Sequence, residues 1–166
     1  MTEPGLAAIG CIAYRERRIM ARAISWVTRS PYTHTVTHLG GGMVGEACGS
    51  GYQISPLTNY LPEVADILWV EPPAGTTMQQ RRTAVDFATA LAKTNLRYGW
   101  ADVAALGLAR FGVKPGPVMA RLHSPRTAFC SQACAQVWEW AGIECTSQPY
   151  YEVTPADLAA LAGGHA

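Results

Sequence analysis

A double proline, Pro72-Pro73, marks a change of pattern along the chain. Before it the apolar segments are short and rich in β-branched residues, which favours strands, and after it alanine and other helix formers predominate. The expected strands are residues 9–14, 33–39, 43–47, 52–55 and 65–70. The expected helices are residues 77–93, 100–111, 129–141 and 155–161, with one further helix around residues 19–27. A strand-rich half followed by a helix-rich half predicts an α+β fold.

The composition is that of a compact, weakly charged chain. Of its 166 residues 49% are hydrophobic and 15% are charged, which is enough apolar material for a core. Lysine and arginine number 13 against 12 acidic residues, so the net charge of +1 gives no general attraction to nucleic acid. We therefore expect one domain, residues 1–166, with no specific nucleic-acid partner.

The cysteines and the N-terminus indicate the compartment. Five cysteines, an odd number at irregular spacings, predict no disulfide framework and at least one free thiol. The first residues include an acid, Glu3, where an export signal needs positive charge. The longest uninterrupted apolar run, residues 103–109, is too short to cross a membrane. These features favour a soluble, cytoplasmic protein without a signal peptide.

Cys130 is a candidate nucleophile because it follows Phe129 at the expected start of a helix. The positive end of the helix dipole lowers the pKa of a thiol in that position. Cysteine is also among the most buried residue types, so a core role is the alternative for Cys130. Cys134, one turn later, is expected to be a core residue of this kind.

A cysteine nucleophile needs a base, and two of the four histidines are candidates. His165 lies near the C-terminus and His123 in a proline-flanked loop. His34 and His38 share one face of the expected strand 33–39. A half-buried structural histidine beside a turn is the alternative for each of them.

Glu46 is an unexpected carboxylate in the apolar strand that follows the turn Gly40-Gly41-Gly42. Carboxylates in apolar surroundings usually have partners. A hairpin across this turn brings Glu46 back toward His34, whose ring it can orient as the third member of a triad. An edge-strand acid that faces water is the alternative.

A zinc site formed by His34, His38, Cys130 and Cys134 is a rival use of the same residues. Residues four apart on a strand are separated by about 13 Å, whereas two ligands of one zinc ion lie within about 4 Å of each other. The alternating threonines disfavour a helix that would bring the two histidines together. We therefore expect no metal and no organic cofactor.

The order of these motifs resembles that of the permuted NlpC-type papain-like cysteine hydrolases, such as the YiiX-like proteins. The matching motifs are Ser30-Pro-Tyr-Thr-His34, Val44-Gly-Glu46-Ala47, Leu96-Arg-Tyr98-Gly-Trp100 and Phe129-Cys130-Ser131-Gln132. In that family a polar residue follows the strand-opening histidine by twelve positions, which is the spacing of His34 and Glu46. This interval selects His34 over His38 as the base.

The resemblance implies a papain-like α+β domain in which Cys130 attacks an amide or ester bond, His34 acts as the base and Glu46 orients the imidazole. It also implies that Tyr98 lines the site and helps to bind the oxyanion. We add Ser131 and His38 as substrate-lining candidates. The implied substrates are peptides, peptidoglycan fragments or acyl-lipids, the last acted on by a hydrolase or an acyltransferase. A wall-directed enzyme without an export signal would need a phage-type route out of the cell.

An alternative of another class is a non-catalytic module that binds an anionic surface. Arg15, Arg18, Arg22 and Arg29 fall on one face of the expected first helix, and residues 15–29 carry five arginines and one glutamate, a local charge of +4. Such a face can attach to a membrane or to nucleic acid. A solvated helix face is the simpler interpretation of the same residues.

Overall fold

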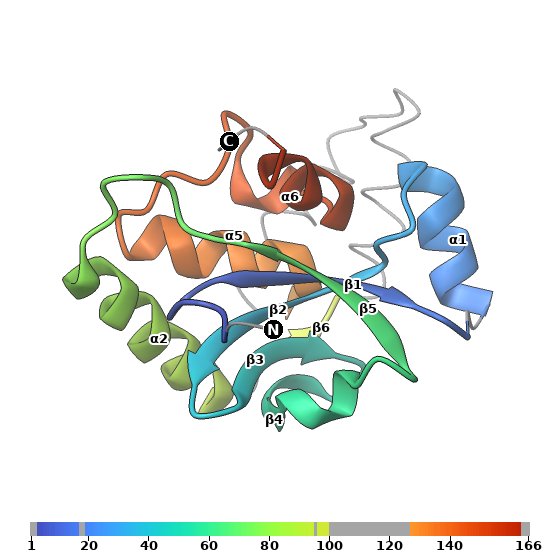
Figure 1. Cartoon of the computed structure of the whole chain (residues 1–166), viewed down its shortest axis with the longest axis horizontal. Helices are drawn as coiled ribbons and strands as arrows, with labels where there is room; N and C mark the ends of the chain where they lie inside the picture. Colours follow the sequence, from blue (N-terminus) through green and yellow to red (C-terminus); the bar gives the residue numbers. More distant parts are fainter. Residues whose placement is uncertain (1–2, 17–18, 95, 100–126, 164–166) are drawn as a thin grey trace.

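A five-stranded antiparallel sheet forms the centre of the fold (Figure 1). The computed structural model describes residues 3–16, 19–94, 96–99 and 127–163. The strands of the sheet are β1 (Ile9–Tyr14), β2 (His34–Gly40), β3 (Met43–Cys48), β4 (Gly51–Pro56) and β5 (Ala65–Val70). They lie in the order β4-β3-β2-β1-β5, and every neighbouring pair is antiparallel. The interior strands β1, β2 and β3 are buried along most of their length.

The hairpin of β2 and β3 depends on a turn of three glycines, Gly40-Gly41-Gly42. Their φ angles are 85°, 60° and 72°, a region that residues with a side chain rarely adopt. Successive side chains of β2 point to opposite faces of the sheet. Thr35 and Thr37 point to one face of the sheet, and His34 and His38 point to the other.

The described helices are α1 (Ile19–Thr28), α2 (Met78–Ala92), α5 (Cys130–Trp140) and α6 (Pro155–Leu161). Thr77 caps α2 and Thr154 caps α6, each in a reciprocal capping box. Helices α2 and α5 pack on each other and on the sheet, and α6 lies against β1 and β5 (Figure 1). A short parallel pair, β6 (Arg97–Tyr98) and β7 (Thr127–Ala128), ends immediately before α5.

Two apolar clusters fill the two faces of the sheet. In the larger one, between the sheet and the helices, Trp138 is fully buried and its Nε1 donates to the carbonyl of Ala7 at 2.7 Å. The smaller cluster lies on the opposite face and consists of Ile12, Val36, Val44, Tyr60 and Ala65. A 3₁₀ turn after β4, η1 (Leu57–Tyr60), supplies the tyrosine of this cluster.

The expected α+β organisation is confirmed, and the element boundaries agree with the sequence pattern. Each expected strand is present, and β5 covers the predicted residues 65–70. The helices expected at 77–93, 129–141 and 155–161 are α2, α5 and α6. The helix expected at 100–111 lies outside the described residues. Among the described helices, none is long and apolar enough to span a membrane.

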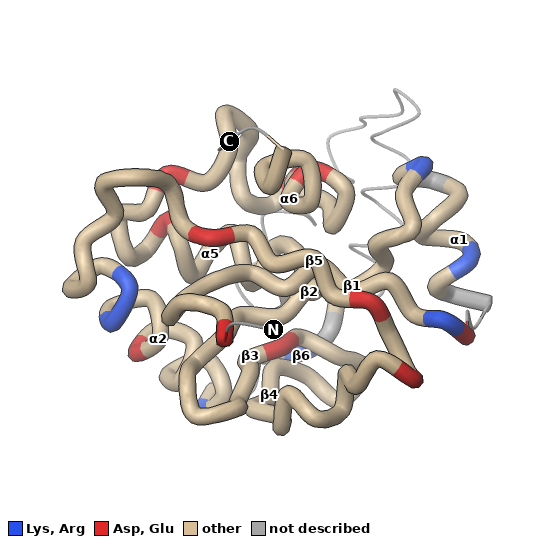
Figure 2. The backbone as a smooth tube through the Cα atoms, in the orientation of Figure 1, with Lys and Arg blue, Asp and Glu red and all other residues tan. Residues whose placement is uncertain are grey.

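The prediction that four arginines share one face of the first helix is wrong in part, because α1 is shorter than the segment 15–29. The helix covers residues 19–28, so Arg15 and Arg29 lie outside it. Arg15 instead forms an ion pair with Asp66 at 2.6 Å, and Arg29 has a positive φ of 51° after the helix end. Arg18 lies outside the described residues. Figure 2 shows basic positions on both α1 and α2, at opposite sides of the molecule.

Candidate active site

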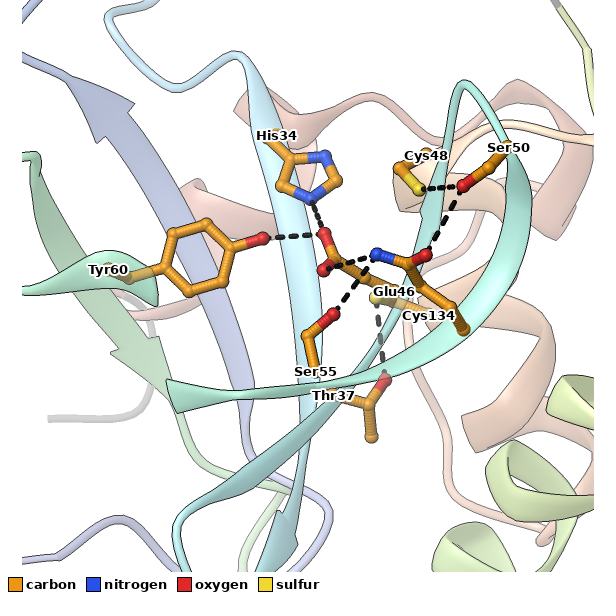
Figure 3. A network of polar contacts seen from close by, with 9 residues as sticks. His34, Thr37, Glu46, Cys48, Ser50, Ser55, Tyr60 and Cys134 are labelled. Carbon is orange, nitrogen blue, oxygen red and sulfur yellow. Dashed lines mark hydrogen bonds and ion pairs between the residues drawn. The ribbon is translucent and has the colours of Figure 1, made fainter. Parts of the chain in front are cut away.

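His34 and Glu46 meet across the β2–β3 hairpin, on the face opposite to the helices. Thr37 pairs with Gly45, so continuing this register places Glu46 opposite Val36 and diagonal to His34. Diagonal neighbours on one face of an antiparallel pair are within reach of long side chains. The Nε2 atom of His34 lies 2.8 Å from Oε2 of Glu46 (Figure 3). The expectation that Glu46 contacts the ring of His34 is therefore confirmed.

The carboxylate of Glu46 is held by several neutral donors as well as by His34 (Figure 3). The hydroxyl of Tyr60 donates to Oε2 at 2.5 Å, and Nε2 of Gln53 donates to Oε1 at 3.3 Å. Burial raises the pKa of Glu46, but hydrogen bonds from His34, Ser55 and Tyr60 lower it more strongly, to about 2. Glu46 is thus a buried anion at neutral pH.

Aromatic rings enclose the imidazole of His34. The ring of Tyr60 stacks on it with a centroid distance of 6.2 Å, and the ring of Tyr14, at the end of β1, stacks at 6.4 Å. The two tyrosine rings are themselves 6.3 Å apart. The imidazole is therefore shielded from water, which strengthens its interaction with Glu46.

Cys130 is the first residue of α5 and is 3% exposed. Burial raises the pKa of its thiol, but the charge of His34 and hydrogen bonds from His34 and Thr35 lower this pKa by a larger amount. The net pKa of Cys130 is therefore below the ordinary value. Burial lowers the pKa of His34, but the charge and hydrogen bond of Cys130, followed by Glu46, raise it above the ordinary value. Both directions favour a thiolate beside an imidazolium. With Nε2 engaged by Glu46, Nδ1 is the ring nitrogen left for Cys130.

In three of the other cysteines the pKa of the thiol is shifted in the opposite direction, upward. Burial raises the pKa of Cys134 and of Cys145, each to about 12. It raises the pKa of Cys11 by more than that of either of these. Cys134 accepts a hydrogen bond from Oγ1 of Thr37 at 3.4 Å, between α5 and β2. The expectation that Cys134 is a core residue is confirmed, and among these four thiols Cys130 is the one prepared for nucleophilic chemistry.

Two of the expected substrate-lining residues point elsewhere. Ser131 is completely buried, and its hydroxyl donates to the carbonyl of Val153 at 2.7 Å, so its side chain faces the core behind α5. His38 lies at the far end of β2, where Nδ1 is 3.1 Å from the carbonyl of Gly5 and the ring packs edge-on against Trp69. Since adjacent helical residues point in different directions, Ser131 cannot share the orientation of the nucleophile.

The backbone of Tyr98 is distant in sequence from the nucleophile but is paired with a residue beside it. Tyr98 pairs with Ala128 in the parallel β6–β7 pair, two residues before Cys130. The side chain of Tyr98 lies outside the described part of the structure. Its expected role at the oxyanion thus stays a prediction.

The four residues of the zinc alternative are not gathered around one point. His38 is four residues along β2 from His34, and Cys134 is bonded to Thr37 on the helix side of the sheet. Within the described residues, no three side chains of histidine, cysteine, aspartate or glutamate are placed to hold a metal ion.

Several functional neighbours were not found from the sequence. Gln53 and Ser55 are two residues apart in β4, which pairs with β3. Polar residues at alternate positions of this strand could have predicted partners for Glu46. Tyr14 and Tyr60 carried no comparable signal, because their contact with His34 joins separate segments of the chain.

No protein-family model matches the chain, and no curated protein is significantly similar to it in sequence. Its function must therefore be inferred from the chemistry of the site. A buried thiol that interacts with an imidazole, which in turn contacts a carboxylate, can be activated as a nucleophile for acyl transfer.

Proposed function

We propose that this protein is a thiol hydrolase of the permuted papain-like type, which cleaves an amide or ester bond through an acyl-enzyme on Cys130. The observation that carries the proposal is the 2.8 Å contact between Nε2 of His34 and the buried carboxylate of Glu46. That contact leaves the other ring nitrogen for Cys130, at the N-terminus of α5. A nucleophile, a base and an orienting group are the parts of a catalytic triad.

In the first half-reaction, Sγ of Cys130 attacks the carbonyl carbon of the substrate as a thiolate. A carbon–sulfur bond forms, and an electron pair moves onto the carbonyl oxygen. The backbone N–H of Cys130 lies in the first turn of α5, where N–H groups have no partner within the helix itself, and can stabilise this oxyanion, with Tyr98 as a second proposed donor. The tetrahedral intermediate then expels the amine or alcohol, which takes a proton from His34.

In the second half-reaction, His34 removes a proton from water as the water attacks the thioester. The carbon–sulfur bond breaks, a carboxylic acid leaves, and Cys130 returns to the thiolate form. Glu46 stays ionised throughout and stabilises the imidazolium of His34. An alcohol or amine in place of water would give an acyltransferase by the same steps.

The substrate candidates are peptide amides, peptidoglycan stem peptides and acyl-lipids. The test is to incubate the protein with each class and to measure the masses of the products and of the intact protein. We expect an acyl adduct that maps to Cys130 and is absent from Cys130→Ala. The matched control is Cys134→Ala, which removes a thiol one turn away and should keep the adduct. Undiminished turnover by Cys130→Ala would exclude the proposed mechanism.

A further inference from the structure

Tyr60 contacts both His34 and Glu46. It ends the η1 turn after β4, is 6% exposed, and reaches the pair from the face of the sheet opposite to the helices. Its hydroxyl points at Glu46, while its ring is stacked on His34 with an interplanar angle of 28° (Figure 3). One side chain thus contacts both members of the pair.

The hydroxyl of Tyr60 and the imidazole of His34 share a single oxygen of Glu46. Oε2 lies 2.5 Å from the Tyr60 hydroxyl and 2.8 Å from Nε2 of His34. Burial raises the pKa of Tyr60, and its hydrogen bond to Glu46 raises it further, so the phenol keeps its proton and remains a donor. A protonated neutral donor stabilises the carboxylate without adding a charge.

The other oxygen of Glu46 is held much more loosely. Oε1 accepts from Gln53 at 3.3 Å, and Gln53 also bonds Ser55 and lies in an exposed position of β4. The terminal torsion of a glutamate side chain has broad energy wells, so a carboxylate does not fix its own rotation. Ser55 also hydrogen-bonds this carboxylate, but the bond from Tyr60 is short and engages the same oxygen that faces His34.

We propose that Tyr60 is a positioning residue, whose hydroxyl fixes Oε2 of Glu46 against Nε2 of His34. This inference rests on the proposed function, because its value lies in orienting the base for Cys130. By sharing the carboxylate oxygen with the imidazole, Tyr60 also lowers the proton affinity of Glu46. The proton that His34 accepts from Cys130 then stays on the ring, where it is needed for the leaving group.

The test compares Tyr60→Phe with Tyr14→Phe. Both variants keep a ring against His34, but only Tyr60 donates to Glu46. Carboxyl ¹³C NMR titration of Glu46 should show its pKa rise by about one pH unit in Tyr60→Phe, because one charge-stabilising hydrogen bond is lost. On the substrate found for Cys130, kcat should fall about tenfold with KM little changed. Tyr14→Phe removes a hydrogen bond to Tyr60 but no donor to Glu46, so it should change the Glu46 pKa much less than Tyr60→Phe does.

Two results would overturn the inference. One is a wild-type Glu46 pKa in Tyr60→Phe, and the other is an equal rise in both variants, which would assign the effect to general packing. The NMR measurement does not depend on catalysis, so its outcome separates the two proposals. If no acyl substrate modifies Cys130 but the Glu46 pKa rises far more in Tyr60→Phe than in Tyr14→Phe, the hydrolase proposal fails and the assignment of Tyr60 to the His34–Glu46 pair is supported.

Discussion

Strand β2 carries two histidines, His34 and His38, on the same face of the sheet, and their surroundings differ. At the first position, Nε2 of His34 lies 2.8 Å from Glu46, a side chain that is 6% exposed. Four residues later, Nε2 of His38 lies 3.6 Å from Glu3, which is 66% exposed. His38 is the more deeply buried of the two histidines. Burial alone therefore does not distinguish the proposed base, His34, from the structural histidine, His38.

The difference between the two sites lies in the carboxylate. A pair with an exposed acid is screened by water and contributes little. Glu46 is desolvated and held by Tyr60 and other donors, so its charge acts on His34 at close range through a less polar medium. At the His38 end, the ring bonds a backbone carbonyl and packs on Trp69, which are structural contacts.

The largest expected effect comes from removing each histidine in turn. His34→Ala should reduce acylation of Cys130 by about a thousandfold or more, because the thiol loses both its proton acceptor and the neighbouring positive charge. His38→Ala should keep most of the acylation rate. The rate is measured with an activated ester such as p-nitrophenyl acetate, with folding checked by circular dichroism. Loss of activity in His38→Ala together with its retention in His34→Ala would reverse the assignment.

The pH dependence of thiol alkylation sharpens the same comparison. The pKa of His34 is raised and that of Cys130 is lowered, so the ion pair forms as pH rises through the Cys130 pKa and disappears as pH rises through the His34 pKa. Cys130 should react with iodoacetamide at pH 6, where an ordinary thiol with a pKa of about 8.5 is almost fully protonated. In His34→Ala the reactivity at pH 6 should fall about a hundredfold.

The controls for alkylation are His38→Ala and the less buried thiols. His38→Ala should keep the wild-type profile of Cys130. Peptide mapping after brief labelling should find Cys130 modified first. Earlier modification of Cys48 or Cys145 in the folded protein would contradict the assignment of the nucleophile.

Changes at Glu46 should have an intermediate effect. Glu46→Gln keeps an acceptor for His34 but removes the charge that stabilises imidazolium, and we expect a loss of about tenfold. Glu46→Ala removes both and should cost about a hundredfold. Each loss is measured as kcat/KM on the substrate of Cys130. A loss in Glu46→Gln as complete as in Cys130→Ala would mean that the carboxylate takes part in proton transfer directly.

The smallest effect is expected at the far end of β2. His38→Phe keeps a ring against Trp69 but removes the hydrogen bond to Gly5, so the free energy of unfolding should fall by about 1 kcal/mol. Urea denaturation measures this change. The alkylation rate of Cys130 should stay at the wild-type value, and a fall in that rate would show that the two ends of β2 are coupled.

The sequence predicted the parts of the site that lie in regular, local structure. The interval between His34 and Glu46 was informative because both residues belong to one hairpin, whose glycine turn adjoins a register shift between His38 and Gly40. Cys130 was identified because a helix start has recognisable chemistry. The strand and helix boundaries followed from periodicity for the same reason.

What the sequence did not reveal depends on contacts between distant segments. Tyr60 reaches Glu46 from an irregular turn fourteen residues later, a contact that no periodic pattern encodes. Ser131 was expected to line the site because of its place next to the nucleophile, but a helix turns its neighbour toward Val153. The side of a helix that a residue occupies is set by packing, which neighbouring positions alone do not define.

The hairpin of β2 and β3 also has a consequence for how the candidate site assembles during folding. The contact between His34 and Glu46 closes a loop of only twelve residues, whereas the bond from Thr37 to Cys134 joins residues 97 positions apart. Short loops cost less chain entropy to close and close faster than long ones. The base and its carboxylate can thus assemble from a contiguous stretch of chain, and the thiol joins them when α5 docks. Under the proposed function, activation of the thiol requires the completed domain, and a nascent chain that ends before Cys130 carries the proposed base without its nucleophile.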